Sequence, residues 1–400
     1  MSAGAVVVYF SRLGGFMYTH ETVVLSAVAE AIAEIKHCEF AARFDDAERH
    51  AGSVFFVPDD TLIADEAAYL GIRGPNDLYG GVVPYPFAKT KAITHQLVDA
   101  CADRPEGWSS AFPEKVKDVV LPGYTVFNLD DARVAARRLL DLGPIRIKEP
   151  LAAGGKGQAV AATIEQAKTL LETFDAVEIA VNGLVLESNL RDVTTVSIGQ
   201  ITIDDMTIAY HGKQRVAINN EGSPTYGGSN LVCVRGGWKA LAELPMPSAV
   251  RLAAAQAKFY DAATSKYPGF TVSRRNYDVA QGFDGQGRLR SGVLEASWRS
   301  GGASTAELTA MKQFAQDPAL QVVEACSVKR FGRGQQAPRK AVIQYQGDDP
   351  EDGPIIRYTM ITRKLGRNGS GRRTQHAASL ETVTLLGSVR RRVSASVRWC

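Results

Sequence analysis

The order of apolar and polar positions predicts an α/β arrangement at the start of the chain. Residues 5–10, AVVVYF, form an apolar run, a helical pattern extends from about His20 to Ile35, and the segment SVFFVPDDTL contains another apolar run. A strand, helix, strand order is typical of a parallel sheet covered by helices. We place the end of this first domain, residues 1–88, after a segment dense in Gly and Pro.

Residues 89–190 are expected to form a second unit. A helix is predicted over about 89–102, and another helix opens at NLDDA, with Asn128 or Asp130 as its N-cap. The short strand PIRIKEP, a glycine loop, a further strand and a helix capped by Thr163 follow. This succession predicts a small α/β unit.

After Gly183 the pattern changes to an alternation of apolar and polar residues, for example in TTVSIGQITI and NYDVAQGF. Such alternation is typical of an antiparallel sheet, and one helix is predicted around 247–264. We assign residues 191–330 to this third unit and 331–400 to a C-terminal extension. The expected fold class is therefore α/β with α+β character.

Composition narrows the class of protein. Of the 400 residues, 45% are hydrophobic and 22% are charged, which is typical of a folded globular protein. No apolar run is long enough to span a bilayer, the first strand lacks the features of a secretory signal, and the five cysteines form no CxxC pair. These features favour a reducing cytoplasm and argue against a disulfide framework or a structural zinc site.

The charge is unevenly distributed. Residues 363–400 contain nine Lys or Arg against the single Glu381. A basic segment with Gly and Ser is typical of a solvated tail, and contact with nucleic acid or anionic lipid is the alternative. Because the rest of the chain has no basic bias, we expect neither a specific nucleic-acid partner nor a membrane.

A predicted β-hairpin carries the strongest candidate chemistry. The turn signal DGQG at 284–287 places Asp278 opposite Glu295 on the neighbouring strand. Two carboxylates in this position repel each other unless a cation lies between them, and Mg²⁺ prefers such oxygen ligands, to which Ser297 could add a third. Arg299, on the same face, would then contact phosphate or a developing negative charge. The alternative is a solvent-exposed hairpin with scattered charges.

Two weaker motifs precede the hairpin. In IRIKEPLAAGGKGQAV, Lys148 ends an apolar strand before a GGKG loop whose backbone could approach phosphates, although a plain hairpin turn would look the same. In GLVLESNL, an apolar strand breaks near Glu187, and its unpaired backbone could bind an adenine edge. A crossover between two subdomains is the alternative for this second motif.

The order of these motifs resembles the ATP-grasp superfamily over most of residues 1–305, and the chain is similar to a bacterial ATP-grasp-like, biotin carboxylase-like family. In the superfamily two lysines and a glycine-rich loop bind the phosphates of ATP, a linker strand holds the adenine, and an acidic residue and an ExN motif bind magnesium. Members combine an N-terminal parallel α/β domain, a small lid subdomain and a mainly antiparallel C-terminal sheet with helices.

The resemblance assigns these roles by position. The phosphate lysines are Lys91, with Lys89 as the alternative, and Lys148; the loop is Gly154, Gly155, Lys156 and Gly157; the adenine linker contains Glu187 and Leu190; and the metal carboxylates are Asp278 and Glu295. EASWRSGG, at 295–302, is similar to ExNxRxGG, with Arg299 as a catalytic residue beside Lys148. Ser297 departs from the motif, because a neutral hydroxyl is a poorer ligand than the usual amide oxygen.

The resemblance implies an enzyme that uses ATP and Mg²⁺, with Mn²⁺ as an alternative metal. It would activate a small-molecule carboxylate as an acyl phosphate, which an amine, a thiol or another nucleophile then attacks. An ATP-binding regulatory protein and an ATP-grasp-type kinase are the alternatives. Three loops are candidates for contact with the substrate: VPDDTL, RGPNDLYGG and NNEGSPTYGGSN. A homodimer is a candidate assembly.

Overall fold

The computed structural model describes residues 4–11, 18–45, 52–151 and 157–366. Its N-terminal part contains β1 (Ala5–Tyr9), α1 (His20–Lys36), β2 (Glu39–Arg43) and β3 (Val54–Pro58). These strands form a parallel sheet in the order β2-β1-β3, which confirms the predicted parallel α/β start. α1 begins where the Thr19 hydroxyl accepts a hydrogen bond from the Thr22 backbone N–H.

The segment after β3 leads to the centre of the molecule. β4 (Leu62–Ile63), α2 (Ala64–Tyr69) and β5 (Gly81–Val83) are followed by two 3₁₀ turns, η1 (Pro86–Lys89) and η2 (Lys91–Thr94). β5 pairs with β4 and with β13 (Thr271–Val272), so residues nearly two hundred positions apart share one small sheet.

The helix predicted over 89–102 is wrong. Residues 91–95 are all buried, whereas a helix at a protein surface buries only one face. Their backbone is held by tertiary contacts instead: the Thr125 hydroxyl donates to the Ala92 carbonyl, and the Thr125 N–H donates to the Gln96 carbonyl. The buried 3₁₀ turn η2 and an irregular segment after it therefore replace the α-helix.

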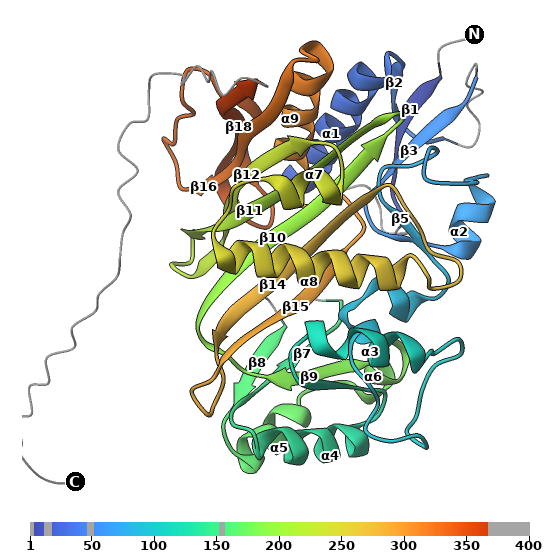
Figure 1. Ribbon diagram of the computed structural model, residues 1–400, viewed down its shortest axis with the longest axis vertical. Helices are drawn as coiled ribbons and strands as arrows, with labels where there is room; N and C mark the ends of the chain where they lie inside the picture. Colours follow the sequence, from blue (N-terminus) through green and yellow to red (C-terminus); the bar gives the residue numbers. More distant parts are fainter. Residues whose placement is uncertain (1–3, 12–17, 46–51, 152–156, 367–400) are drawn as a thin grey trace, which may run out of the picture.

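A small subdomain, the lid, lies at the lower end of the molecule in Figure 1. Its antiparallel sheet has the order β6-β9-β7-β8, from β6 (Gly123–Val126), β9 (Leu184–Ser188), β7 (Ile145–Lys148) and β8 (Gln158–Ala161). α4 (Leu129–Leu140), α5 (Ile164–Leu171) and α6 (Ala176–Asn182) accompany it, and α3 (Ala111–Val116) and η3 (Lys117–Val119) precede it. The predicted caps Asn128 and Thr163 are confirmed, since each side chain accepts a backbone hydrogen bond at its helix start.

The largest sheet has eight strands in the order β15-β14-β10-β11-β12-β16-β18-β17, all antiparallel. The strands are β10 (Arg191–Ile203), β11 (Met206–Ile218), β12 (Pro224–Arg235), β14 (Arg274–Phe283), β15 (Leu289–Ser297), β16 (Leu320–Phe331), β17 (Val342–Asp349) and β18 (Gly353–Gly366). The predicted antiparallel sheet is thus confirmed, and it continues beyond residue 330 through β17 and β18.

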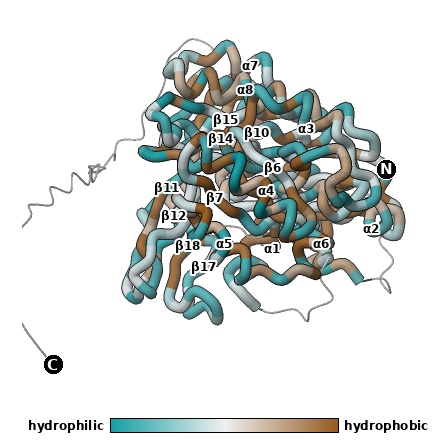
Figure 2. The backbone as a smooth tube through the Cα atoms, turned by 90° about the horizontal axis from the view of Figure 1, so that it is seen from below, coloured by the Kyte–Doolittle hydropathy of each residue, from teal (hydrophilic) through white to brown (hydrophobic). Residues whose placement is uncertain are grey.

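Helices cover this sheet at two places (Figure 1). α8 (Ser248–Thr264), next to the short α7 (Trp238–Glu243), packs on β10, β14 and β15, as predicted for 247–264. α9 (Ser304–Gln316) packs on β12, β16 and β18, and α1 packs against α9, which joins the N-terminal domain to the sheet in one apolar core. Figure 2 shows apolar stretches, in brown, between hydrophilic stretches along strands and helices alike.

Among the described residues, no helix combines the length and the apolar character that a membrane crossing requires.

Candidate active site

Asp278 and Glu295 face each other across the β14–β15 hairpin, as the turn signal predicts. The predicted register holds at this pair only because of an irregularity. Val279 pairs with Val293, so Leu294 is an extra residue on β15, a β-bulge directly beside Glu295. Bulges next to functional sites redirect side chains, and this one brings the second carboxylate level with the first.

Neutral donors surround the Asp278 carboxylate. Its Oδ1 accepts hydrogen bonds from the Ser197 hydroxyl at 2.7 Å and the Asn276 amide at 3.2 Å, and its Oδ2 accepts from the Gln214 amide at 2.9 Å. Burial, and secondly the neighbouring Glu295 carboxylate, raise the pKa of Asp278. The pair is therefore a site of concentrated negative charge that a cation would stabilise, and it is not a freely solvated hairpin.

The two candidate early lysines have different surroundings. The Lys91 Nζ, on η2, is buried and lies 3.5 Å from the Glu295 Oε2. The Lys89 Nζ instead lies 2.8 Å from the Asp60 Oδ2, in the predicted substrate loop VPDDTL. Of the two, Lys91 is the lysine beside the carboxylate pair.

Arg299 lies on the loop that follows β15. Its Nε is 3.8 Å from the Asp60 Oδ1, and its Nη1 donates to the Ser300 carbonyl at 3.0 Å. Asp60 therefore lies between two cations, Lys89 and Arg299. The structure brings one of the candidate substrate loops to the candidate catalytic arginine.

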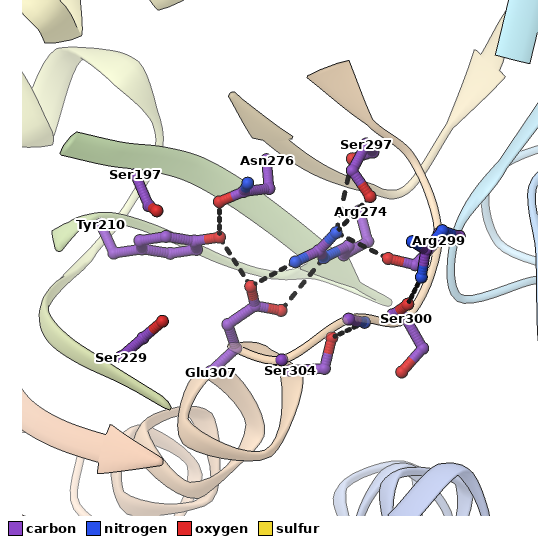
Figure 3. A network of polar contacts seen from close by, with 12 residues as sticks. Ser197, Tyr210, Ser229, Arg274, Asn276, Ser297, Arg299, Ser300, Ser304 and Glu307 are labelled. Atoms are coloured by element: carbon purple, nitrogen blue, oxygen red, sulfur yellow. Dashed lines mark hydrogen bonds and ion pairs between the residues drawn. The ribbon is translucent and has the colours of Figure 1, made fainter. Parts of the chain in front are cut away.

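A buried ion pair fixes the backbone of this loop (Figure 3). Arg274 donates through Nη2 to the Glu307 Oε1 at 2.7 Å and through Nε to the Oε2 at 3.2 Å, while its Nη1 donates to the Arg299 carbonyl at 2.6 Å. Both members of the pair are almost fully buried. Arg274 thus positions Arg299 through the main chain.

Two tyrosine hydroxyls also donate hydrogen bonds to Glu307. The hydroxyls of Tyr79 and Tyr210 lie 2.7 Å and 2.6 Å from its two oxygens. Burial by itself would raise the pKa of Glu307, but the Arg274 guanidinium outweighs it and the pKa is lowered. The carboxylate is therefore ionised and every buried partner is satisfied, which makes this network a rigid support for the loop.

Ser297 lies near the same guanidinium. Its hydroxyl oxygen is 3.4 Å from the Arg274 Nη1. A metal ligand this close to a fixed positive charge is disfavoured. Asn276 pairs directly with Ser297 on the neighbouring strand and places an amide beside Asp278.

Lys148 and Glu187, predicted to bind the phosphates and the adenine, contact each other in the lid. They form an ion pair, and the other Glu187 oxygen lies 3.4 Å from the His95 Nε2. Burial alone would raise the pKa of Glu187, but Lys148 and His95 hold it down at about 2. In this structure both oxygens of the Glu187 carboxylate therefore face protein cations or donors, Lys148 and His95.

The remaining predicted residues lie near the lid. Leu190 is buried with Leu121 and Ala280. Gly157 adopts a φ of +60°, and its carbonyl accepts from the Glu149 N–H at 2.9 Å, which adds a hydrogen bond beside the β7–β8 pairing. Gly154, Gly155 and Lys156 lie outside the described residues.

Residues 10–359 match a single family model, described as "Protein of unknown function (DUF3182)". The chain belongs to the DUF3182 family. A search of curated proteins found no match for this DUF3182 chain.

The DUF3182 chain is similar in structure to N5-carboxyaminoimidazole synthetase from Staphylococcus aureus, solved in complex with ADP. The two share 11% sequence identity over 90% of this chain and 94% of that chain, with a TM-score of 0.50. A biotin carboxylase from Campylobacter jejuni, solved as a β-γ-ATP complex, shares 10% identity over 89% and 87% of the two chains, also with a TM-score of 0.50. These likenesses show the fold of the DUF3182 chain, which is the ATP-grasp fold, as the motif order predicts.

Several site residues of the DUF3182 chain escaped the sequence analysis. Asn276 could have been found, because it lies two positions from Asp278 on one strand and so shares its face. Asp60 appeared only as part of a candidate loop. His95 and Arg274 had no local signal, since their partners are distant in sequence.

Proposed function

We propose that the protein is an ATP- and Mg²⁺-dependent ligase that activates a carboxylate for attack by an amine or another nucleophile. One observation carries this proposal: in an ATP-grasp fold, the carboxylates of Asp278 and Glu295 face each other with the Lys91 ammonium beside them. Carboxylates opposed in this way destabilise the sheet unless a cation binds. Two opposed carboxylates beside a buried lysine support a role in binding a metal and phosphates.

The donor set fits magnesium. Asp278 and Glu295 would hold the ion. Neither neighbour is placed as a third ligand, because the Ser297 hydroxyl lies near the Arg274 guanidinium, and the Asn276 amide turns its nitrogen to Asp278 and its oxygen to the Tyr210 hydroxyl. When bound, Mg²⁺ would neutralise phosphate charge during phosphoryl transfer.

The protein's own cations would orient the two substrates. Lys91 and Lys148 would bind phosphate oxygens of ATP, and Arg299 would stabilise the charge that develops on the transferred phosphoryl group. In the first step a carboxylate oxygen of the acceptor substrate bonds to the γ-phosphorus as the bond to ADP breaks. In the second step the nucleophile attacks the acyl carbon, phosphate leaves with the C–O electron pair, and the nucleophile loses a proton.

Nucleotide binding without turnover is the second candidate. The ion pair between Lys148 and Glu187 favours it, because a lysine engaged by a buried carboxylate must exchange partners before it can bind a phosphate. A regulatory ATP-binding protein would need no such exchange on every catalytic cycle.

Calorimetric titration with a nonhydrolysable ATP analogue, with and without Mg²⁺, tests the nucleotide site. We expect tight binding that depends on Mg²⁺ in the wild type, weaker binding in Lys148→Ala, and lost metal dependence in Glu295→Gln. Glu243→Gln, at an exposed position on α7, is the matched control and should behave as wild type. Release of ADP and phosphate with a carboxylate and an amine then separates a ligase from a binding protein, and absence of nucleotide binding overturns both.

A further inference from the structure

Arg357, on β18, has no direct partner among the described residues. Within residues 4–11, 18–45, 52–151 and 157–366, no hydrogen bond or ion pair engages its guanidinium. The side chain is half-buried, and an arginine stays charged in such surroundings. A partly buried charge of this kind is costly unless it is paired and hydrogen-bonded.

Three carboxylates, Glu21, Asp349 and Asp352, act on Arg357 from a distance, and the two aspartates are engaged by other partners. Asp349 accepts the backbone N–H groups of His20, Glu351 and Asp352. Asp352 forms an ion pair with Lys329, whose Nζ also lies 3.1 Å from the His20 Nε2. These contacts pair Lys329 directly, whereas the carboxylates act on Arg357 only from a distance.

Arg357 lines a surface hollow, which we name the Arg357 pocket. The hollow is shallow: its atom-free space of about 190 Å³ includes open solvent and leaves no room for an enclosed water molecule, so a bound anion would lie at its mouth. Its polar lining includes Tyr226, Thr305, Ser327, Lys329 and Gln344, and none of the described residues that line it is acidic. Hydroxyl, amide and guanidinium groups without a carboxylate are suited to an anion.

The pocket adjoins the candidate active site. Gly302, three residues after Arg299, lies in its wall against the Tyr226 ring. The Tyr226 hydroxyl is 2.8 Å from the Ser229 hydroxyl, and the Asp278 carboxylate acts electrostatically on Tyr226. An anion held by Arg357 would therefore lie next to the loop that carries the candidate catalytic arginine.

We propose that the Arg357 pocket binds an anionic group, a carboxylate or a phosphate, of the acceptor substrate. This inference rests on the proposed function, because it assigns the acceptor a second charged group besides the carboxylate that is activated. The planar guanidinium suits both anions, since its two parallel N–H groups can engage two oxygens at once. The ligase would accordingly select dianionic or phosphorylated acceptors.

Calorimetric titration with inorganic phosphate and, separately, with succinate tests the pocket and distinguishes the two anions. Each titration is run without nucleotide and with saturating nonhydrolysable ATP analogue and Mg²⁺, so that the nucleotide site is filled. We expect one of the anions to bind the wild type with the analogue present, and Arg357→Gln to weaken this binding at least about tenfold.

Arg333→Gln is the matched control, because Arg333 is 80% exposed, pairs with Asp348 and does not line the pocket. It should bind the anion as the wild type does. Thermal unfolding checks that Arg357→Gln folds. If it does not fold, Arg357→Lys decides the test. Lysine keeps the positive charge but lacks the two parallel N–H donors of the guanidinium, so it should weaken anion binding severalfold.

Two results would overturn the proposed anion site, provided that nucleotide binding is intact. One is that neither anion binds, and the other is that an anion binds equally well to wild type and the Arg357 variants. Binding of the ATP analogue itself should be equal in wild type and Arg357→Gln. Failure of that nucleotide titration in the wild type would instead count against the proposed function. The two failures are therefore distinguishable.

Discussion

Lys148 and Glu187, on the neighbouring lid strands β7 and β9, form an ion pair in which only 3% and 2% of the side chains are exposed. Removing one member leaves the other charge buried without a partner, which is far more costly than the pair itself. The pair therefore has two roles in the proposed enzyme: it stabilises the lid sheet, and it holds Lys148 until phosphates compete for it.

We expect Glu187→Gln to destabilise the lid by about 3–5 kcal/mol, because Lys148 then remains charged in a dry site. Hydrogen–deuterium exchange of the backbone amides in β7 and β9 measures this locally, which matters in a chain of several subdomains. Asp130→Asn, in an exposed pair with Arg133 on α4, is the control and should change exchange by less than about 0.5 kcal/mol. Equal effects of the two substitutions would show that burial of the pair is energetically unimportant.

The same carboxylate predicts how lid stability depends on pH. The folded-state pKa of Glu187 is about 2, below its ordinary value of 4.5. A depressed carboxyl pKa stabilises the folded state above the unfolded-state pKa, and this stabilisation is lost as the pH falls through the folded-state pKa. Lid stability should therefore fall between about pH 4.5 and pH 2, and the difference between wild type and Glu187→Gln should shrink over that interval. A constant difference contradicts the assignment.

Gly302 predicts a steric limit in the loop after Arg299. A Cβ at Gly302 would lie 2.3 Å from the Tyr226 Cε1, whereas one at Gly301 would meet only the Arg274 Nη2, at 4.0 Å. Gly302→Ala should therefore destabilise the protein by about 1–3 kcal/mol, and Gly301→Ala should be nearly neutral. Thermal unfolding compares the two adjacent variants.

Adding Tyr226→Ala to Gly302→Ala separates the steric effect from a general loss of glycine. The double variant should recover part of the stability lost in Gly302→Ala, relative to Tyr226→Ala alone. Additive losses would show that the Tyr226 ring moves aside freely and does not define the loop.

Sequence reasoning succeeded where the signal was local. The caps Asn128 and Thr163, the parallel strands and the opposition of Asp278 and Glu295 follow from turn chemistry and periodicity within short windows. The Leu294 bulge was not predictable, because the turn alone implies one continuous register. The Asp278–Glu295 opposition was thus right although the pairing nearer the turn is shifted by one residue.

The misses are tertiary. The segment 91–95 has an apolar and polar pattern compatible with a helix, but both the lid and the large sheet pack around it and bury every residue. The bond from Tyr79 to Glu307 spans 228 positions and that from Arg274 spans 33, so no local motif could indicate either. Networks of this kind are set by the fold. This one acts on the proposed chemistry indirectly, because it orders the loop that carries Arg299.

Asp278→Asn should lose metal binding without losing stability in the metal-free state. The substitution removes one of two facing carboxylates; burial and secondly Glu295 raise the pKa of Asp278. The single Asn oxygen can still accept from Ser197, and the exposed Gln214 can turn its amide oxygen toward the new Asn amide nitrogen. Without metal, the variant should be as stable as wild type or more stable by up to about 1 kcal/mol. Thermal unfolding without Mg²⁺ and nucleotide measures this. With both ligands present, the wild type should gain stability and the variant should not.

The matched control is Asp317→Asn, after α9 and remote from the pair, which should gain stability with ligands as the wild type does. A large loss of stability in metal-free Asp278→Asn would mean that the carboxylate is a structural acceptor and not a metal ligand.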